Sequence, residues 1–211
     1  MVPLFGRRAI VMPATTTLSL KTCAEQFAAL LDRCEATGKK SEALGLEPGM
    51  TTVMERLAQA RQSENSVYVI GNGGSAAVAS HTVNDFLNVA KLRAFTLHDS
   101  SLLTCMANDY GYENAFARIL AQVGKPHDVL IAISSSGNSK NIRNAAAQAT
   151  ASGMFVITLT GFAGDNPLRS LGDVNLWLDA RNYGQVEIGH QFLLHNMADR
   201  FGANDGELAK S

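Results

Sequence analysis

The 211-residue chain has few cysteines and no long apolar run. Cys23, Cys34 and Cys105 are an odd number of cysteines without a C-x-x-C spacing, which argues against a disulfide framework and favours a reducing compartment. No window approaches the roughly 20 apolar residues that a membrane-spanning helix needs. The apolar stretch near the N-terminus is too short for a secretory signal, because Pro13 ends it. We therefore expect a cytoplasmic protein with no membrane partner.

An excess of charge of one sign is also missing. The formal net charge is −1, from 18 basic and 19 acidic residues, and no run of lysines or arginines occurs. Surfaces that bind nucleic acid or anionic membranes usually carry a basic patch, so we expect no nucleic-acid partner. Hydrophobic residues make up 46% of the chain and charged residues 18%, which is the balance of an ordinary globular domain with one sizeable core.

The glycine-rich turn of this chain matches neither of two common nucleotide-binding motifs. Gly71-Asn72-Gly73-Gly74-Ser75 follows the apolar run Val67–Ile70. Position 76 is alanine, so the G-x-G-x-x-G spacing of a dinucleotide site fails, and no lysine stands in a GKS or GKT context. We expect no nucleotide cofactor.

What the sequence does contain is two similar turns from strand to helix. The first is Gly71–Ser75, and the second is Ser134–Ser139, which follows the apolar run Val129–Ile133. Small residues allow backbone N–H groups and hydroxyls to approach an anion at a helix N-terminus. A serine-rich turn can also simply cap its helix. Two such turns in one domain favour a phosphorylated ligand held between them.

From Ser66 onward, predicted strands alternate with predicted helices. Strands are expected at residues 67–70, 93–97, 129–133, 155–160 and 174–178, and helices at 76–89, 115–123, 140–151 and 186–201. The strands are nearly continuous apolar runs, which is typical of a parallel sheet covered on both faces. We predict an α/β domain over residues 66–211, with a doubly wound, mostly parallel sheet and a ligand at the carboxyl ends of the strands.

Residues 1–65 are predicted to form an N-terminal helical extension. Apolar residues recur at helical spacing between Leu18 and Cys34, and a second amphipathic helix is expected to begin near Thr51, which would be its N-cap. A loop containing Pro48 and Gly49 would separate the two helices. Neither helix carries evident chemistry, and we expect their apolar faces to be buried against another subunit.

Two pairs of residues on predicted helices have the chemistry of metal ligands. His81 and Asp85 are four residues apart after the first turn, so they share a helix face. Glu187 and His195 are eight residues apart on the last helix and can project to one side. Each pair alone is also explained by surface contacts, whereas together they offer the nitrogen and oxygen ligands of a divalent metal. His190 is expected to make a structural contact.

Three residues near these motifs have less specific interpretations. His98 ends a predicted strand near the expected ligand cleft, where a surface turn is the favoured alternative, while Cys105 lies in an apolar stretch and is expected to be a core thiol rather than a nucleophile. Tyr183 precedes the last predicted helix, where it could close over a substrate or belong to a simple connection.

Four segments, taken in order and with their spacing, resemble the sugar isomerase (SIS) domain family. They are Gly71–Ser75, Asn108–Tyr112, Ile133–Ser139 and Val156–Gly161. Within that family the chain resembles the phosphoheptose isomerase branch, from about Ser66 to Phe201. The resemblance implies a flavodoxin-like fold and a homotetramer assembled through the N-terminal helices. It also implies isomerisation of sedoheptulose 7-phosphate to D-glycero-D-manno-heptose 7-phosphate through an enediol, for lipopolysaccharide or related glycan precursors.

The resemblance assigns roles to particular residues. The phosphate would be held by the hydroxyls of Ser75, Ser134, Ser135, Ser136 and Ser139. The sugar would be lined by Asn72, Gly73, Gly74, Asn108, Asp109 and Glu187. Zinc or another divalent metal would be bound by His81, Asp85, Glu187 and His195. In catalysis, Asp85 would be the base and His195 would carry protons between the oxygens.

Two of these positions depart from the family pattern. The family has glutamate where this chain has Asp85, and glutamine where it has Glu187. If Asp85 is held by the metal, Glu187 is the alternative base. Two other functions stay open: isomerisation of another sugar phosphate, and a non-catalytic sugar-phosphate-binding or assembly protein, such as one that binds the replication initiator. The four potential ligands together favour an enzyme.

Overall fold

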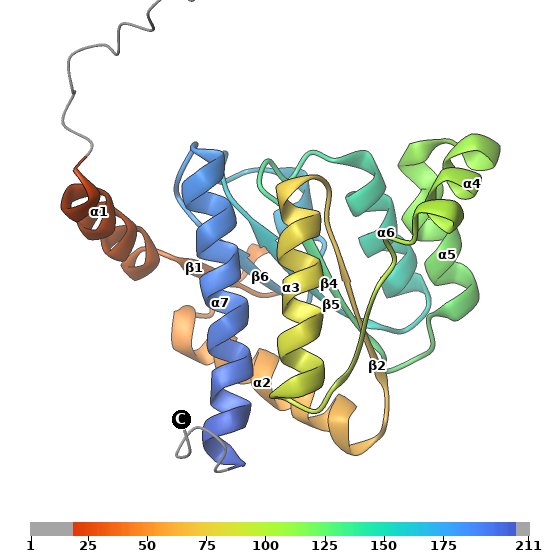
Figure 1. The fold of residues 1–211 in the computed structure, drawn as a ribbon, viewed down its shortest axis with the longest axis horizontal. Coiled ribbons are helices and arrows are strands. Elements are labelled where there is room, and N and C mark those ends of the chain that lie inside the picture. Colours follow the sequence, from red (N-terminus) through yellow and green to blue (C-terminus); the bar gives the residue numbers. More distant parts are fainter. Residues whose placement is uncertain (1–18, 206–211) are drawn as a thin grey trace, which may run out of the picture.

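The computed structural model describes residues 19–205, which form a six-stranded β-sheet covered by helices on both faces (Figure 1). The strands are β1 (Glu35–Thr37), β2 (Ser66–Ile70), β3 (Arg93–Thr96), β4 (Val129–Ser134), β5 (Phe155–Thr160) and β6 (Val174–Trp177). The α-helices are α1 (Leu20–Asp32), α2 (Leu46–Gln62), α3 (Gly74–Asn88), α4 (Ser100–Tyr110), α5 (Ala115–Val123), α6 (Lys140–Ala151) and α7 (Tyr183–Asn204). Leu18 and the N-terminal segment considered as a signal lie outside the described residues.

The winding of the sheet reverses between β2 and β4. The strand order is β1-β6-β5-β4-β2-β3, so β3 lies on one side of β2 and the later strands lie on the other. Every pair is parallel except β1 with β6. The predicted doubly wound, mostly parallel sheet is confirmed, and the crevice for a ligand in such a sheet lies at the carboxyl ends of β2 and β4.

The two faces of the sheet support two separate cores. Along β2, Val67 and Val69 face the core that also contains buried residues of α2, α3 and α7, whereas Tyr68 and Ile70 face the core under α5 and α6. Successive strand residues point to opposite faces, which explains why a strand buried on both faces has an apolar residue at every position. Complete burial of each such side chain stabilises the fold by about 1.5–3 kcal/mol.

The long helix α7 runs beside α3 on one face of the sheet (Figure 1). It begins at Tyr183, earlier than expected, because the Asn182 side chain caps it by accepting a hydrogen bond from the backbone N–H of Gln185 at 3.2 Å. Although α7 has 22 residues, no helix among the described residues combines the length and hydropathy of a bilayer-spanning segment.

The beginning of α2 differs from the expectation. The helix starts at Leu46, after Gly45, rather than near Thr51. Pro48 is tolerated because the first N–H groups of a helix have no intrahelical partner. Val53 and Leu57 on the apolar face of α2 are fully buried within this chain, and Met54 packs partly buried against the same core, so burial of this helix against another subunit was a wrong expectation. The boundary at residue 66 stays a prediction, although β1 and α2 share the sheet and core of the later segment.

Helix α4 was not expected from the sequence. Its N-cap is Asp99, whose Oδ1 accepts a hydrogen bond from the N–H of Leu102 at 2.8 Å. None of its residues is fully buried, and Leu103 and Met106 pack only partly buried against the core under α5 and α6. Cys105 lies on this helix and is exposed, which makes the expectation of a core thiol wrong.

Candidate active site

The structure brings the two glycine- and serine-rich turns together at the carboxyl ends of β2 and β4. Between them lies a cavity of about 150 Å³, which we call the serine pocket. Its lining residues are Asn72, Ser75, Ile133, Ser134, Ser135, Ser136, Ser139, Tyr183 and Glu187. The pocket therefore contains all five serines assigned to the phosphate, and Tyr183 lies at its wall rather than in a remote connection.

Three helices begin at the serine pocket. Helix α3 starts just after Gly73, whose φ of 53° is a conformation that favours glycine. Helix α6 follows Ser139, and α7 starts at Tyr183. The N-terminus of each helix carries the positive end of its dipole and free N–H groups, so the backbone around this pocket favours an anion.

The serine hydroxyls are not consumed by helix capping. Ser139 occupies the N-cap position of α6, but its side chain makes no capping hydrogen bond. Ser135 is only 4% exposed, and its Oγ has no hydrogen-bond partner among the described residues. A buried hydroxyl is normally paired, because leaving it without a partner costs about 1–3 kcal/mol. The unpartnered Oγ is the feature expected of a site that a ligand oxygen completes.

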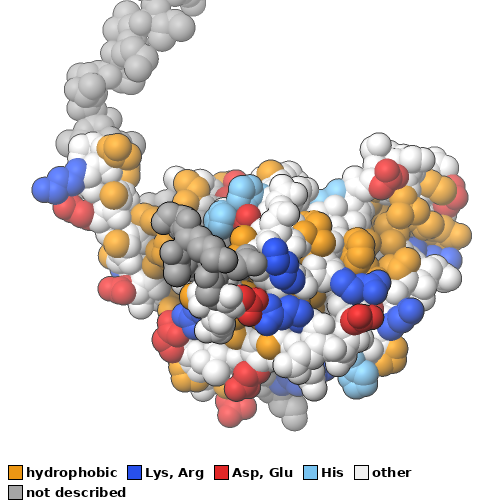
Figure 2. All heavy atoms as spheres, turned by 60° about the horizontal axis from the view of Figure 1, so that its bottom comes forward, with side chains coloured by type: hydrophobic (Ala, Val, Ile, Leu, Met, Phe, Trp, Pro, Cys, Tyr) orange, Lys and Arg blue, Asp and Glu red, His pale blue; other side chains and the backbone are white. Residues whose placement is uncertain are grey.

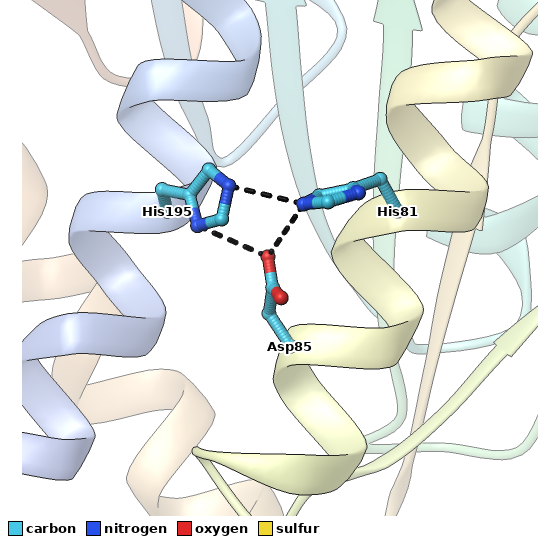
Figure 3. A group of neighbouring side chains, drawn as sticks. All are labelled: His81, Asp85 and His195. Carbon is cyan, nitrogen blue, oxygen red and sulfur yellow. Dashed lines mark hydrogen bonds and ion pairs between the residues drawn. The ribbon is translucent and has the colours of Figure 1, made fainter. Parts of the chain in front are cut away.

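A second group of functional side chains lies where α3 and α7 face each other. His81 and Asp85 project from α3 and meet His195 of α7 (Figure 3). We call these three residues the histidine cluster. His81 Nε2 is 3.1 Å from His195 Nε2, while Asp85 Oδ2 is 3.5 Å from His81 Nε2 and 3.1 Å from His195 Nδ1. One ligand atom from each residue lies within 4.8 Å of the others.

The histidine cluster has the donor set and spacing of a metal site. Bonds of about 2.1 Å to a tetrahedral zinc ion place neighbouring ligand atoms roughly 3.4 Å apart, close to the separations found here. Asp85 Oδ2 is buried without a hydrogen-bond partner of normal geometry. The side chains of His81 and His195 are 53% and 43% exposed, and histidines also reach the surface on the face drawn in Figure 2. An ion could therefore enter from solvent.

Glu187 lies between the serine pocket and the histidine cluster. It lines the pocket and also a shallow cavity of about 530 Å³ that includes His81 and His195. A Cβ atom at Gly74 would clash with its carboxylate, so the glycine makes room for this side chain. Glu187 is not a member of the group of converging ligand atoms, and its role as a fourth ligand stays a prediction.

Two other residues assigned to the sugar lie apart from the serine pocket. Asn108 and Asp109 are exposed at the end of α4, and Asn108 Nδ2 donates a hydrogen bond to Asp109 Oδ1 at 2.9 Å. Neither residue lines the pocket in this chain. Gly73 is also exposed, at the mouth of the first turn.

Two further histidines have structural contacts near the site. His98 accepts a hydrogen bond from the N–H of Gly71 at 3.4 Å through Nε2, and burial lowers its pKa. It supports the first turn from below instead of lying in a surface turn. His190 is fully buried in α7, and its Nε2–H donates to the Thr160 carbonyl at 3.1 Å. Burial lowers its pKa to about 4, and the structural contact expected for it is confirmed.

Sequence reasoning missed Asn141, which lies in the first turn of α6 and is 3% exposed. Its side chain forms hydrogen bonds with Asn72 of the first turn. Its position in the sequence, two residues after Ser139, could have indicated it. The first turn of a helix faces the same crevice as the loop that precedes it.

Comparisons with known proteins agree with this geometry. Residues 26–161 match the SIS domain family. The phosphoheptose isomerase of Thiobacillus denitrificans is 38% identical over 164 residues, which are 73% of this chain and 80% of that protein. That of Geotalea daltonii is 35% identical over 169 residues, 76% of this chain and 88% of that protein.

The fold also matches a solved structure. The phosphoheptose isomerase from Neisseria gonorrhoeae has a TM-score of 0.73 and 27% identity, and the match covers 89% of this chain and 100% of that one. Fold and sequence point to the same group of proteins. The chain belongs to the SIS domain family, in its phosphoheptose isomerase branch.

Proposed function

We propose that this chain is an aldose–ketose isomerase that converts sedoheptulose 7-phosphate to D-glycero-D-manno-heptose 7-phosphate, a precursor for lipopolysaccharide or related glycans. The observation that carries the proposal is the placement of the histidine cluster beside the serine pocket, with Glu187 lining the space between them. An anion site alone would serve a binding protein. A carboxylate and two imidazoles next to it supply the acid–base groups that an isomerase needs.

The serine pocket would hold the phosphate. Ser134, Ser135 and Ser139 provide hydroxyls there, and the N-termini of α3, α6 and α7 provide a favourable field. Binding the phosphate at one end fixes the position of the sugar chain, so the carbonyl group at the other end is held next to the acid–base side chains. The sugar would extend from the serine pocket past Glu187, which would bring its reacting carbons toward the histidine cluster.

The isomerisation needs two kinds of proton transfer. Asp85 would remove a proton from C1 of the ketose, and the C2 oxygen would gain a proton, which gives the enediol. Return of a proton to C2 and loss of the O1 proton then yield the aldose. His195 would carry the proton between the oxygens, and its Nδ1 lies 3.1 Å from Asp85 Oδ2. Glu187 is the alternative base.

His81, Asp85 and His195 would hold the divalent metal, with zinc as our first choice because both nitrogen and oxygen ligands suit it. When bound, the ion would supply electrophilic polarisation of the carbonyl. With Asp85 holding the ion, Glu187 would act as the base.

A tetrameric assembly in the cytoplasm is the second part of the proposal. Apolar side chains on α1 and α7 remain exposed: Leu20 is 87%, Ile188 61% and Phe192 50% exposed. Ile188 lines the cavity that includes His81 and His195, and exposed apolar groups of this kind favour a subunit interface. Light scattering of the purified protein tests this directly: a tetramer mass is expected, and a monomer at micromolar concentration would contradict it.

Turnover and metal content test the function in one preparation. Purified protein should contain a stoichiometric divalent metal by elemental analysis and should convert sedoheptulose 7-phosphate in a proton NMR assay with zinc present. The aldose product should appear with exchange of solvent deuterium into the sugar. Protein that binds the sugar phosphate but leaves it unchanged would favour the non-catalytic binding function. Faster conversion of a different sugar phosphate would assign another substrate.

A further inference from the structure

The side chains of Asn72 and Asn141 form a reciprocal pair between the two turns of the serine pocket. Asn72 Nδ2 donates to Asn141 Oδ1 at 2.9 Å, and Asn141 Nδ2 donates to Asn72 Oδ1 at 2.9 Å. Asn72 follows β2 and lines the pocket, whereas Asn141 is 3% exposed at the start of α6. The pair therefore connects the turn after β2 to the start of α6.

A single backbone group determines which way both amides face. The N–H of Ile142 donates to Asn141 Oδ1 at 3.0 Å. A backbone N–H can only donate, so the atom of Asn141 next to it must be the oxygen. The Asn141 NH₂ group is then directed at Asn72, which in turn must present its oxygen to that NH₂ group. The orientation of Asn72 is thus fixed by residues outside the pocket.

Tyr112 completes this arrangement from the exposed side. Its hydroxyl donates to Asn72 Oδ1 at 2.8 Å. An amide oxygen has two lone pairs, and the two donors, Tyr112 and Asn141, occupy both. Within residues 19–205, Asn72 Nδ2 makes one hydrogen bond, to Asn141. The group that Asn72 retains for a ligand in the pocket is therefore its second N–H.

We propose that Asn141 is a positioning residue that makes Asn72 a hydrogen-bond donor, and only a donor, to an oxygen atom of the bound sugar phosphate. The proposal rests on the proposed function for the nature of the ligand. The ionised phosphate oxygens and the carbonyl oxygen of a sugar phosphate can only accept hydrogen bonds, whereas its hydroxyls can also donate. An Asn72 amide turned the other way would direct its own oxygen at phosphate or carbonyl oxygens, and this contact would be repulsive. Asn141 prevents that orientation without touching the ligand.

A double-mutant cycle tests the proposal. Asn72→Ala removes the donor, Asn141→Ala releases its orientation, and the double variant removes both. One hydrogen bond to a charged or strongly polarised oxygen is worth about a tenfold change in affinity. We expect each single variant to raise KM and the dissociation constant for sedoheptulose 7-phosphate about tenfold, with a smaller change in kcat. Adding Asn141→Ala to Asn72→Ala should then change affinity little.

The chain offers a matched control on the same helix. Asn144 lies one turn further along α6 and donates to the Glu113 carbonyl and to Asn114 Oδ1, at 2.9 and 3.1 Å. Asn144→Ala removes hydrogen bonds from α6 to the same neighbouring segment that carries Tyr112, but it leaves Asn72 untouched. We expect unchanged affinity. Affinity lowered as strongly as in Asn141→Ala would overturn the proposal, since general loosening of α6 would then explain both variants.

Tyr112→Phe tests the same network without disturbing the core, because Tyr112 is 48% exposed. It removes one of the two donors to Asn72 Oδ1, and we expect affinity to fall about threefold. This loss is smaller than the one expected when a whole hydrogen bond to a charged group is removed. If Asn141→Ala does not fold, Asn72→Ala decides: unchanged affinity in that variant would contradict the proposal, because Asn72 would then donate no hydrogen bond to the ligand.

Calorimetric titration separates this proposal from the proposed function. Sedoheptulose 7-phosphate and inorganic phosphate are the probes, and neither titration requires turnover. Wild-type protein that binds without isomerising would overturn the proposed function alone, and the cycle can still be measured. Wild-type protein that binds neither probe would overturn both. Full additivity of the two alanine substitutions would overturn only the positioning role.

Discussion

The serine pocket and the histidine cluster are built in opposite ways. In the pocket, short side chains such as Ser134 and Ser135 are 5% and 4% exposed and lie directly on turns held by the sheet. In the cluster, His81 and His195 are about half exposed and reach toward each other from two helices. The backbone fixes the geometry of the pocket, whereas packing of α3 against α7 fixes that of the cluster. Binding and chemistry can therefore be disrupted separately.

The largest effect is expected from removing an imidazole of the cluster. His195→Ala should lower kcat about 10²–10⁴-fold, the usual contribution of a general acid–base group, while phosphate affinity and the midpoint of thermal unfolding change little because the side chain is partly exposed. The measurements are turnover by NMR, phosphate titration and calorimetry. His127→Ala is a control on a loop that precedes β4, at the opposite end of that strand. Loss of phosphate binding in His195→Ala would mean that the two regions are not separable.

A second effect should appear in the pH dependence of stability. It arises from His190 of α7, whose hydrogen bond to the Thr160 carbonyl anchors the helix to the sheet. Burial lowers the pKa of His190 from 6.5 to about 4, so between these values the unfolded state binds more protons than the folded state. Stability is fully present above pH 6.5 and falls as the pH is lowered. By pH 4 the lowered pKa of this histidine alone should reduce the free energy of unfolding by about 3 kcal/mol.

Urea unfolding at several pH values measures this loss. His190→Gln keeps an N–H donor for the Thr160 carbonyl but does not titrate, so its stability should fall less steeply below pH 6.5 than that of the wild type. Equal slopes in the two proteins would show that His190 does not set the acid sensitivity. Because α7 carries His195 and also Tyr183 and Glu187 of the pocket lining, weakening of this anchor should affect both regions.

A third experiment targets the space between the two regions. Gly74→Ala places a methyl group against the Glu187 carboxylate. Displacing a side chain that contacts substrate by about 1 Å can cost 10²-fold in rate, so kcat should fall by about that factor. A Gly-to-Ala change in a helix usually stabilises the fold by about 0.4–1 kcal/mol, so unfolding should not become easier. Full activity with a raised unfolding temperature would show that the position of Glu187 is not critical.

Much of the fold could be predicted because its main signal is local. Strands buried on both faces, such as β4, are continuous apolar runs between turn residues, and the alternation of strands with helices indicates the parallel sheet. The elements that were missed lack that signal. Strand β1 has only three residues, and no residue of α4 is fully buried. The start of α2 was misplaced because Pro48 was interpreted as part of a loop.

The site was predictable only where its residues are close in sequence. A spacing of four residues places His81 and Asp85 on one helix face. The approach of His195, 114 residues after His81, depends on the packing of α7 beside α3, and spacing within α7 cannot supply it. The resemblance to the family supplied that pairing. It also grouped Glu187 with the ligands, whereas the structure places it beside Gly74 and outside the cluster.

The smallest effect concerns the serine pocket alone. Ser135 Oγ is buried and has no hydrogen-bond partner among the described residues, so Ser135→Ala removes no bond from the free protein. Its stability should be unchanged or slightly higher, because an unsatisfied buried hydroxyl is lost. Affinity for sedoheptulose 7-phosphate and for inorganic phosphate should fall about tenfold, since the hydroxyl would bond a charged oxygen, while kcat at saturation is kept. Ser170→Ala, whose hydroxyl bonds the Pro167 carbonyl away from the pocket, is the control. If Ser135→Ala instead lowers stability and leaves affinity intact, the Ser135 hydroxyl stabilises the fold and does not bind the ligand. The serine pocket is then less completely preformed for an anion than its contrast with the histidine cluster implies.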